Sequence, residues 1–156
     1  MPKIKYVGRL YENTYRINLH THDFWEIVRY TKGSGLVEID GEIIPFQEND
    51  IFAIPPNVPH TDYSDTGFQN YHYTFNDDDF NRLSYMKFPD TENNDFLTIM
   101  KQLYHEYHLK RKNYQNIIDS LYTVLFHYIL ALSEEAESNQ SVSYTHLRAH
   151  ETSQDL

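Results

Sequence analysis

The pattern of apolar and polar residues changes near Pro89, and the two parts of the chain follow different periods. Before this proline, short runs rich in β-branched and aromatic residues alternate with turn residues, as is typical of β-strands. The predicted strands are Phe24–Thr31, Leu36–Ile39, Glu42–Phe46, Ile51–Ile54 and Phe68–Phe75. Asp40-Gly41 is the clearest turn, because both central residues of a type I′ hairpin need a positive φ. Many short strands at close spacing predict a sandwich or a barrel.

After Pro89, apolar residues recur every three or four positions, as on one face of a helix. The first predicted helix carries Phe96, Ile99, Met100, Leu103, Tyr104 and Tyr107. The second runs from about Tyr114 to Leu132 and is apolar over more than one stripe, so we expect it to have two packing partners. The joint between them, Lys110-Arg111-Lys112, is short and predicts an antiparallel helical hairpin.

From Ser133 onward the sequence is polar and predicts a linker. The last residues, SYTHLRAHETSQDL, have no periodicity and resemble translated adapter or vector DNA. We therefore interpret the residues from about Ser143 as non-native and expect disorder there. The predicted organisation is a barrel over residues 1–88, a helical hairpin over 89–135, and a linker with a disordered tail over 136–156.

Composition narrows the class of protein. A length of 156 residues suits one domain, and 14 Tyr, 9 Phe and 1 Trp argue against a disordered chain. The absence of cysteine excludes disulfides and thiolate sites and fits a cytoplasmic protein. The N-terminus lacks an apolar leader, and the longest apolar run, Val124–Leu132, is too short to cross a bilayer, so no membrane contact is expected. A net charge of −10 opposes binding of nucleic acid by this chain alone.

The most distinctive polar residues lie in the run His20-Thr21-His22-Asp23-Phe24-Trp25-Glu26, which we predict to be one strand. Alternate side chains of a strand point the same way, so His20, His22 and Glu26 are predicted to share a face. Two imidazoles and a carboxylate suit a metal ion, and His60 could face them across a barrel after a rigid proline-rich approach. A hydrogen-bonded polar cluster without metal is the alternative reading.

The same parity predicts neighbours for this cluster. Phe24, Val28 and Tyr30 share the even face and are the candidates for pocket lining, whereas Trp25 is predicted to pack on the opposite face. His72 and Tyr73 are adjacent, and parity alone leaves open which of them points inward.

The spacing His20-x-His22-x3-Glu26-x6-Gly33 resembles the first cupin motif. Asn49-Asp50, Pro55 and His60 resemble a degenerate second motif, in which Asn49, Asn57 and Ser64 depart from the usual residues. Over residues 10–135 the chain is similar to the N-terminal ligand-sensing domain of AraC-type bacterial transcription regulators. This resemblance implies a mainly β fold, namely a cupin barrel (a double-stranded β-helix or jelly roll) followed by an antiparallel helical hairpin that dimerises.

The resemblance further implies a cytoplasmic sensor of a small molecule such as a sugar, not an enzyme. It implies a homodimer that reaches DNA only through a helix-turn-helix domain missing from this chain. The implied ligand-binding residues are His20, His22, Phe24, Glu26, Val28, Tyr30 and His60. The predicted dimerisation residues are Ile118, Leu121, Leu125, Tyr128 and Ile129.

No cofactor is favoured, although His20, His22, Glu26 and His60 would be the ligands of a divalent metal ion if one bound. Two alternatives stay open. One is a metal-dependent cupin enzyme, such as an isomerase or dioxygenase, and the other is a stand-alone carbohydrate-binding cupin.

Overall fold

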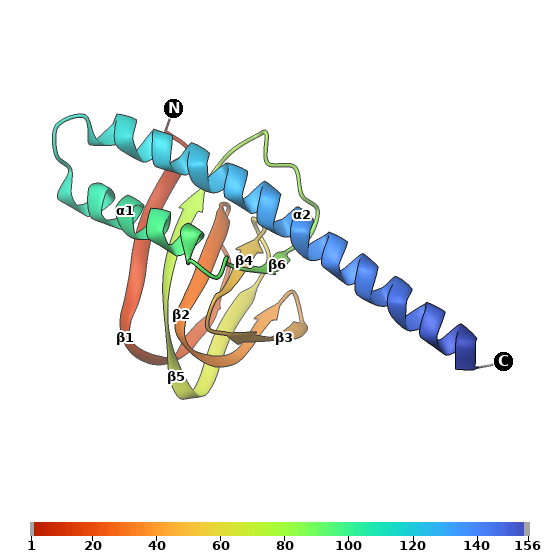
Figure 1. The fold of residues 1–156 in the computed structure, drawn as a ribbon. Coiled ribbons are helices and arrows are strands. Elements are labelled where there is room, and N and C mark those ends of the chain that lie inside the picture. The colour runs from red at the N-terminus through yellow and green to blue at the C-terminus, as the bar shows by residue number, and fades with distance from the viewer. Residues whose placement is uncertain (1, 155–156) are drawn as a thin grey trace.

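A curled antiparallel sheet forms the first part of the molecule, and two helices lie along one outer side of it (Figure 1). The computed structural model describes residues 2–154, with side chains described for residues 2–139. The strands are β1 (Ile4–His20), β2 (Trp25–Ile39), β3 (Glu42–Gln47), β4 (Asp50–Ile54), β5 (His60–Phe75) and β6 (Met86–Pro89). The helices are α1 (Asp95–Leu109) and α2 (Tyr114–Gln154), which run antiparallel to each other.

The strand order is β1-β5-β2-β4-β6, and β3 pairs with β2 through a tight hairpin. At that hairpin Asp40 has a φ of 50° and Gly41 a φ of 82°, as the predicted type I′ turn requires. The long strands β2 and β5 bend together near Gly33 and Gly67, whose φ values are 86° and 95°. A Cβ on Gly33 would collide with the Gly67 carbonyl oxygen, so this close crossing needs glycine.

The curled sheet separates two hydrophobic cores. The first fills the barrel interior and consists of Val28, Tyr30, Val37, Ile39, Ile44, Phe46, Phe52, Ile54 and Phe68. The second lies between the outer face of the sheet and the helices, and includes Trp25, Ile27, Tyr73, Phe75 and Phe80. Trp25 therefore packs on the face opposite the interior, as its parity predicts.

Helix α2 covers the outer face of the sheet with one apolar stripe at heptad spacing. This stripe comprises Ile118, Tyr122, Leu125, Ile129 and Leu132, each at most 6% exposed. The prediction of Ile118, Leu125 and Ile129 as dimerisation residues is therefore wrong. The physical reason is that the outer face of the sheet is itself apolar and needs this stripe as its cover. Phe75 of β5 packs against Tyr122, and Phe80 of the segment between β5 and β6 packs against Phe126.

The segment Tyr114–Asn139 is long and apolar enough to cross a membrane by length and composition alone. Burial of one stripe against the sheet accounts for part of this apolar character, since 33% of its most apolar window is buried, and the core helix of a soluble protein passes the same test.

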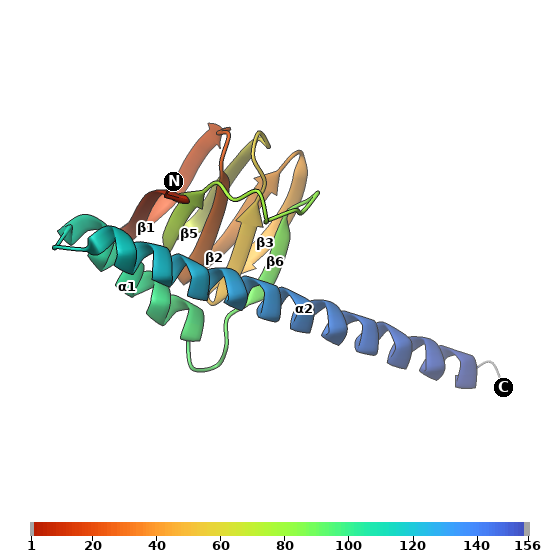
Figure 2. The ribbon, with the colours of Figure 1, turned by 90° about the horizontal axis from the view of Figure 1, so that it is seen from above.

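Two differences from the sequence prediction concern the ends of the chain. Strand β1 begins at Ile4, although the sequence predicts no strand before His20. It lies at the sheet edge with few buried residues, so its apolar signal is weak. Helix α2 continues to Gln154 through the segment predicted to be a linker and a disordered tail (Figure 2). Leu132 and Ser133 are still buried there, and Glu134, Glu135 and Ala136 favour a helix.

A buried ion pair joins the barrel to the helices. Arg29 of β2 points outward, and its Nε and Nη2 donate to Asp90 Oδ2 at 3.2 and 3.1 Å. Nη2 also donates to Asn94 Oδ1, and Nη1 donates to the Tyr30 carbonyl. Both charged side chains are at most 1% exposed. Arg29 thus reaches from the sheet to the start of α1.

Asp90 also serves as the N-terminal cap of α1. Its Oδ1 accepts from the backbone N–H of Phe96 and its Oδ2 from that of Leu97, each at 3.0 Å. The residue at the N-cap position itself, Asn94, makes no side-chain capping bond. A carboxylate here satisfies free N–H groups and favours the positive end of the helix dipole.

We expect Arg29→Met to lower the free energy of unfolding by about 3–5 kcal/mol, because it leaves the Asp90 carboxylate buried without its cation. Urea unfolding monitored by circular dichroism measures this loss. Arg16→Met, the same change at an exposed position on β1, is the matched control; its loss should stay below about 1 kcal/mol. Equal losses in the two variants would contradict the role given to Arg29.

Candidate functional site

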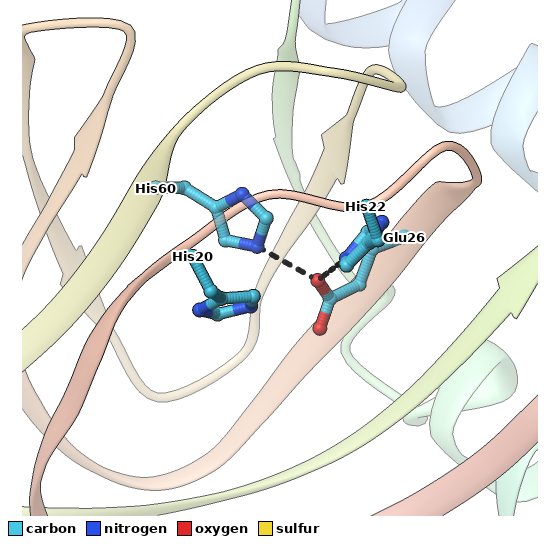
Figure 3. A group of neighbouring side chains, drawn as sticks. All are labelled: His20, His22, Glu26 and His60. Atoms are coloured by element: carbon cyan, nitrogen blue, oxygen red, sulfur yellow. Dashed lines mark hydrogen bonds and ion pairs between the residues drawn. The ribbon is translucent and has the colours of Figure 1, made fainter.

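Three histidines and one glutamate meet at one end of the barrel interior (Figure 3). His20 is the last residue of β1, His22 lies in the following loop, Glu26 is the second residue of β2, and His60 opens β5. The prediction that His20, His22 and Glu26 lie on one strand is therefore wrong, because the chain turns at residues 21–24. They converge through the turn and through the pairing of His20 with His60 across β1 and β5.

The four side chains are close enough to share one small ligand or ion. One candidate donor atom from each residue lies within 4.8 Å of the others. Glu26 Oε2 is 2.9 Å from His22 Nε2 and 2.9 Å from His60 Nε2 (Figure 3). The rings of His20 and His60 are 4.1 Å apart between centroids.

Each of the three imidazoles is oriented by a backbone carbonyl. Nδ1 lies 2.8 Å from the Asn18 carbonyl oxygen in His20, 3.0 Å from that of Phe24 in His22, and 2.9 Å from that of Val58 in His60. A carbonyl oxygen only accepts, so Nδ1 must carry a proton in each ring. The Nε2 atoms are then the free positions, and in His22 and His60 they point to Glu26.

This arrangement determines the charge of the cluster. The ionised carboxylate of Glu26 also only accepts, so His22 and His60 can bond to it only when Nε2 is protonated as well. Both rings are then imidazolium ions. The geometry thus places two positively charged N–H groups on one carboxylate oxygen.

The pKa shifts follow this arrangement. The hydrogen bond with Glu26 raises the pKa of His22. Burial lowers the pKa of His60, but the bond with Glu26 and other favourable contacts outweigh burial, and the net pKa is raised. Burial of Glu26 opposes its ionisation, yet the bonds from His22 and His60 prevail and hold the pKa of this carboxyl far below its usual value.

A cavity of about 230 Å³ adjoins the cluster inside the barrel. Its walls are formed by Leu10, Ile17, His20, Glu26, Val28, Ile54, His60, Asp62, Asn70 and His72. The wall combines aliphatic side chains with two carboxyl groups, an amide and three imidazoles. Such a mixed lining can both bury and orient a small molecule.

The structure separates the predicted ligand residues into two groups. His20, Glu26, Val28 and His60 line the cavity. His22 contributes through Glu26, and Phe24 packs on the His22 ring with centroids 6.3 Å apart. Tyr30 is buried in the interior core, where its hydroxyl donates to Asp62 Oδ2 at 2.7 Å.

Sequence reasoning missed Asp62 and Asn70 and left His72 undecided. His72 pairs with Val28 across β2 and β5, so the cross-strand register places it beside a predicted lining residue. Its Nδ1 lies 2.9 Å from Asn70 Oδ1. Burial lowers the pKa of His72 and raises the pKa of Asp62, so this side of the cavity favours neutral groups.

The His20, His22, Glu26 and His60 set also fits a divalent metal ion. Metal-bound histidines commonly donate their second N–H to a carbonyl, and all three rings here have such a partner. A cation at the centre would replace the two Nε2 protons that face Glu26. Three imidazoles and one carboxylate are suitable ligands for zinc, iron, nickel or manganese.

The curled antiparallel sheet with its interior cavity is a barrel of the cupin class. Residues 6–126 match the family model of the AraC-like ligand binding domain. The chain belongs to this family, which confirms the resemblance stated from the sequence. The predicted fold class, a mainly β cupin barrel followed by a helical hairpin, is also confirmed. A comparison with curated proteins found no match.

Several solved cupin structures are similar to part of the chain. A salicylate 1,2-dioxygenase from Pseudaminobacter salicylatoxidans is 22% identical with a TM-score of 0.42, and the match covers 48% of this chain and 22% of the enzyme. An RmlC-like cupin from Shewanella frigidimarina is 21% identical with a TM-score of 0.42, over 51% of this chain and 73% of that one. A predicted oxalate decarboxylase from Thermotoga maritima is 19% identical with a TM-score of 0.43, and the match covers 47% of this chain and 67% of that one. This chain thus spans about a fifth of the dioxygenase.

The charged cluster predicts a pH dependence of stability. Because the pKa values of His22 and His60 are raised, these residues contribute fully to the free energy of unfolding below the usual histidine pKa of 6.5. Their contribution is lost as the pH rises through the raised pKa values. The lowered pKa of Glu26 makes its contribution complete above the usual 4.5. The cluster therefore stabilises the fold most between these two values.

We expect the stability difference between the wild type and a His22→Gln, His60→Gln double variant to shrink by about 1–3 kcal/mol as pH rises from 6 to 9, because the charged hydrogen bonds disappear. Urea unfolding with a chelator present measures this difference. His127→Gln, at an exposed position on α2, is the control and should leave the pH profile unchanged. A difference that stays constant from pH 6 to 9 would contradict the ionic arrangement.

Proposed function

We propose that this domain senses a small molecule bound in the barrel cavity and is the input part of an AraC-type transcription regulator. The observation that carries the proposal is the cavity at the His20, Glu26 and His60 cluster, in a chain of the AraC-like ligand binding family. Its volume of about 230 Å³ is below the roughly 300–1,000 Å³ of drug-sized sites. A compact ligand fits this size.

The chemistry of the lining favours a ligand with several hydroxyl groups, such as a monosaccharide. Carboxylates and imidazoles exchange hydrogen bonds with hydroxyls, and Glu26, Asp62 and His72 are polar residues of the lining. The aliphatic side chains of Val28 and Ile54, which pair with His72 and Glu26 across neighbouring strands, can pack on the C–H groups of a sugar ring. We further propose that the domain acts in the cytoplasm and is not an enzyme.

A monosaccharide panel tests the proposal. We expect at least one sugar to bind by isothermal titration calorimetry, and Glu26→Gln to weaken it about 10- to 100-fold, because a hydrogen bond to a charged group contributes about 1.5–3 kcal/mol. Glu38→Gln, the same change at an exposed site on β2, is the control and should bind as the wild type does. Equal affinity in the Glu26 and Glu38 variants, or no binding from the panel, would count against a sugar sensor.

A metal-dependent cupin enzyme, such as an isomerase or dioxygenase, is the second candidate. The observation that favours it is the set of three carbonyl-oriented imidazoles around Glu26. A bound cation would supply Lewis-acid chemistry at the cavity end. Metal analysis of protein purified without a His tag distinguishes the candidates. One equivalent of metal that His60→Gln removes would favour the enzyme, and metal-free protein that binds a sugar favours the sensor.

A stand-alone carbohydrate-binding cupin would have the same cavity as the sensor domain of a regulator. The two candidates differ in their partners, because only the regulator needs a dimer and a DNA-binding domain.

We propose a homodimer formed through the second apolar stripe of α2. This stripe lies next to the buried one and consists of Ile117, Leu121, Val124 and Tyr128. It keeps the heptad spacing of a helix–helix interface, and Val124 is 40% exposed. Leu121 and Tyr128 belong to the dimerisation residues predicted from the sequence.

A hollow between the two helices continues this stripe. Ile117 and Leu121 line it from α2, and Gln102 and His105 line it from α1. A second copy could insert its own stripe there, as two-fold interfaces are self-complementary. DNA would be contacted only through a helix-turn-helix domain outside this chain, because the net charge of −10 opposes phosphate binding.

We expect the double variant Leu121→Glu, Val124→Glu to be a folded monomer, because four like charges would meet in the desolvated interface. Light scattering after size-exclusion chromatography at micromolar concentration measures the mass. Thr123→Glu adds the same charge on an exposed part of α2 away from the stripe and should remain dimeric. A monomeric wild type would refute the dimer.

A further inference from the structure

A second hollow lies outside the barrel, where β1, β2 and β5 meet α1. Its volume is about 420 Å³, and it is separate from the interior cavity except that Leu10 borders both. Three basic residues line it, namely Arg9 from β1, Lys32 from β2 and Lys101 from α1. Glu48 is its one acidic lining residue. A basic hollow stands out in a chain of net charge −10.

Aromatic rings hold the Arg9 side chain in place. Its guanidinium carbon is 4.8 Å from the centre of the Tyr11 ring and 4.7 Å from that of Tyr104. Its Nη1 also donates to the Tyr71 hydroxyl at 3.5 Å. Cation–π contacts on two rings orient the guanidinium without neutralising its charge. These contacts orient the exposed Arg9 guanidinium, with its planar fork of donors, at the hollow.

The three basic groups have no carboxylate of their own. Among the residues whose side chains the structure describes, the Lys and Arg ion pairs are Lys3–Asp77, Arg29–Asp90, Lys87–Asp50 and Arg111–Glu106. Arg9, Lys32 and Lys101 take part in none of these pairs. Gathering unneutralised cations around one hollow is unfavourable by itself, and an anion bound among them would remove this repulsion.

We propose that this hollow is a binding site for a compact multivalent anion, of the phosphate or small polycarboxylate class. The Arg9 fork would bind two oxygens of the anion, and Lys32 and Lys101 would add point charges. Thr31, Gln69 and the Tyr71 hydroxyl supply further polar groups in the lining. Glu48 opposes any anion, but three basic groups against this one acidic group leave the lining with a net charge of +2.

The position of the site gives the anion a structural effect. Arg9 and Lys32 belong to the barrel, whereas Lys101 belongs to the helical hairpin. An anion bound to all three would bridge the barrel and α1, and would stabilise their packing. This site is independent of the sugar proposed for the barrel interior, because none of its three basic residues lines that cavity.

Calorimetric titration with inorganic phosphate and, separately, with citrate tests the proposal, with sodium chloride added to constant ionic strength. We expect saturable binding of at least one of the two anions at one site, and a rise in melting temperature on binding. Arg9→Gln and Lys101→Gln should each weaken binding at least fivefold. Lys112→Gln, which removes one positive charge from the exposed joint between the helices, should bind as the wild type does.

Three results would overturn the anion site. The first is that neither anion shows saturable binding. The second is that all variants bind as tightly as the wild type, and the third is that Lys112→Gln weakens binding as much as Arg9→Gln and Lys101→Gln do. Lys101 is exposed on α1, so its variant keeps the test valid if Arg9→Gln does not fold. Glu26→Gln should keep full affinity for the anion, so failure of the sugar proposal would not be mistaken for failure of this one.

Discussion

The buried ion pair between Arg29 and Asp90 is the interaction on which the arrangement of barrel and helices depends. Burying two charges is costly unless hydrogen bonds satisfy them, and here both groups have several partners from β2, α1 and the segment between β6 and α1. A hydrophobic contact can slide, but these bonds hold only in one placement. The pair therefore determines where α1 begins and where the hairpin lies on the sheet.

Strand β2 connects this ion pair with the interior cavity. Its outward residues Ile27 and Arg29 contact the helix side, and its inward residues Glu26, Val28 and Tyr30 contact the barrel interior. Arg29 donates to the carbonyl of Tyr30, whose hydroxyl in turn donates to Asp62 in the cavity wall. Tyr30 thus lies between the two regions, with its backbone carbonyl bonded to Arg29 and its hydroxyl bonded to Asp62. This supports a sensing role, since a sensor needs its ligand site and its output surface on one rigid element.

The parts of the fold that depend on local pattern could be predicted from the sequence, and those that depend on distant partners could not. The Asp40-Gly41 hairpin and the two helices follow from turn chemistry and apolar period. Edge strand β1 has little apolar signal, because one of its sides has no neighbouring strand. The two stripes of α2 are visible as apolar character, but only the barrel decides which one is covered, so Ile118, Leu125 and Ile129 were assigned to the wrong surface.

The residues of the candidate site could likewise be predicted only in part from the sequence. The spacing of His20, His22 and Glu26 identifies the cluster, although a turn and not strand parity brings them together. Asp62 and Asn70 join the cavity only through the pairing of β5 with β2, which no local pattern reveals.

The hydrogen bonds of this cluster determine what kind of occupant it accepts. The Nδ1 protons of His22 and His60 are bound to carbonyl oxygens, so only their Nε2 atoms can donate protons to Glu26. Without these protons, the carboxylate needs another positive partner or hydrogen-bond donor. Above the raised pKa values of these histidines, the carboxylate would remain in a largely buried site without its donors. A divalent cation could then replace the protons, and so could the hydroxyl groups of a sugar. The same four residues can therefore serve a metal centre or a sensor, and the difference lies in which donor the rest of the cavity admits.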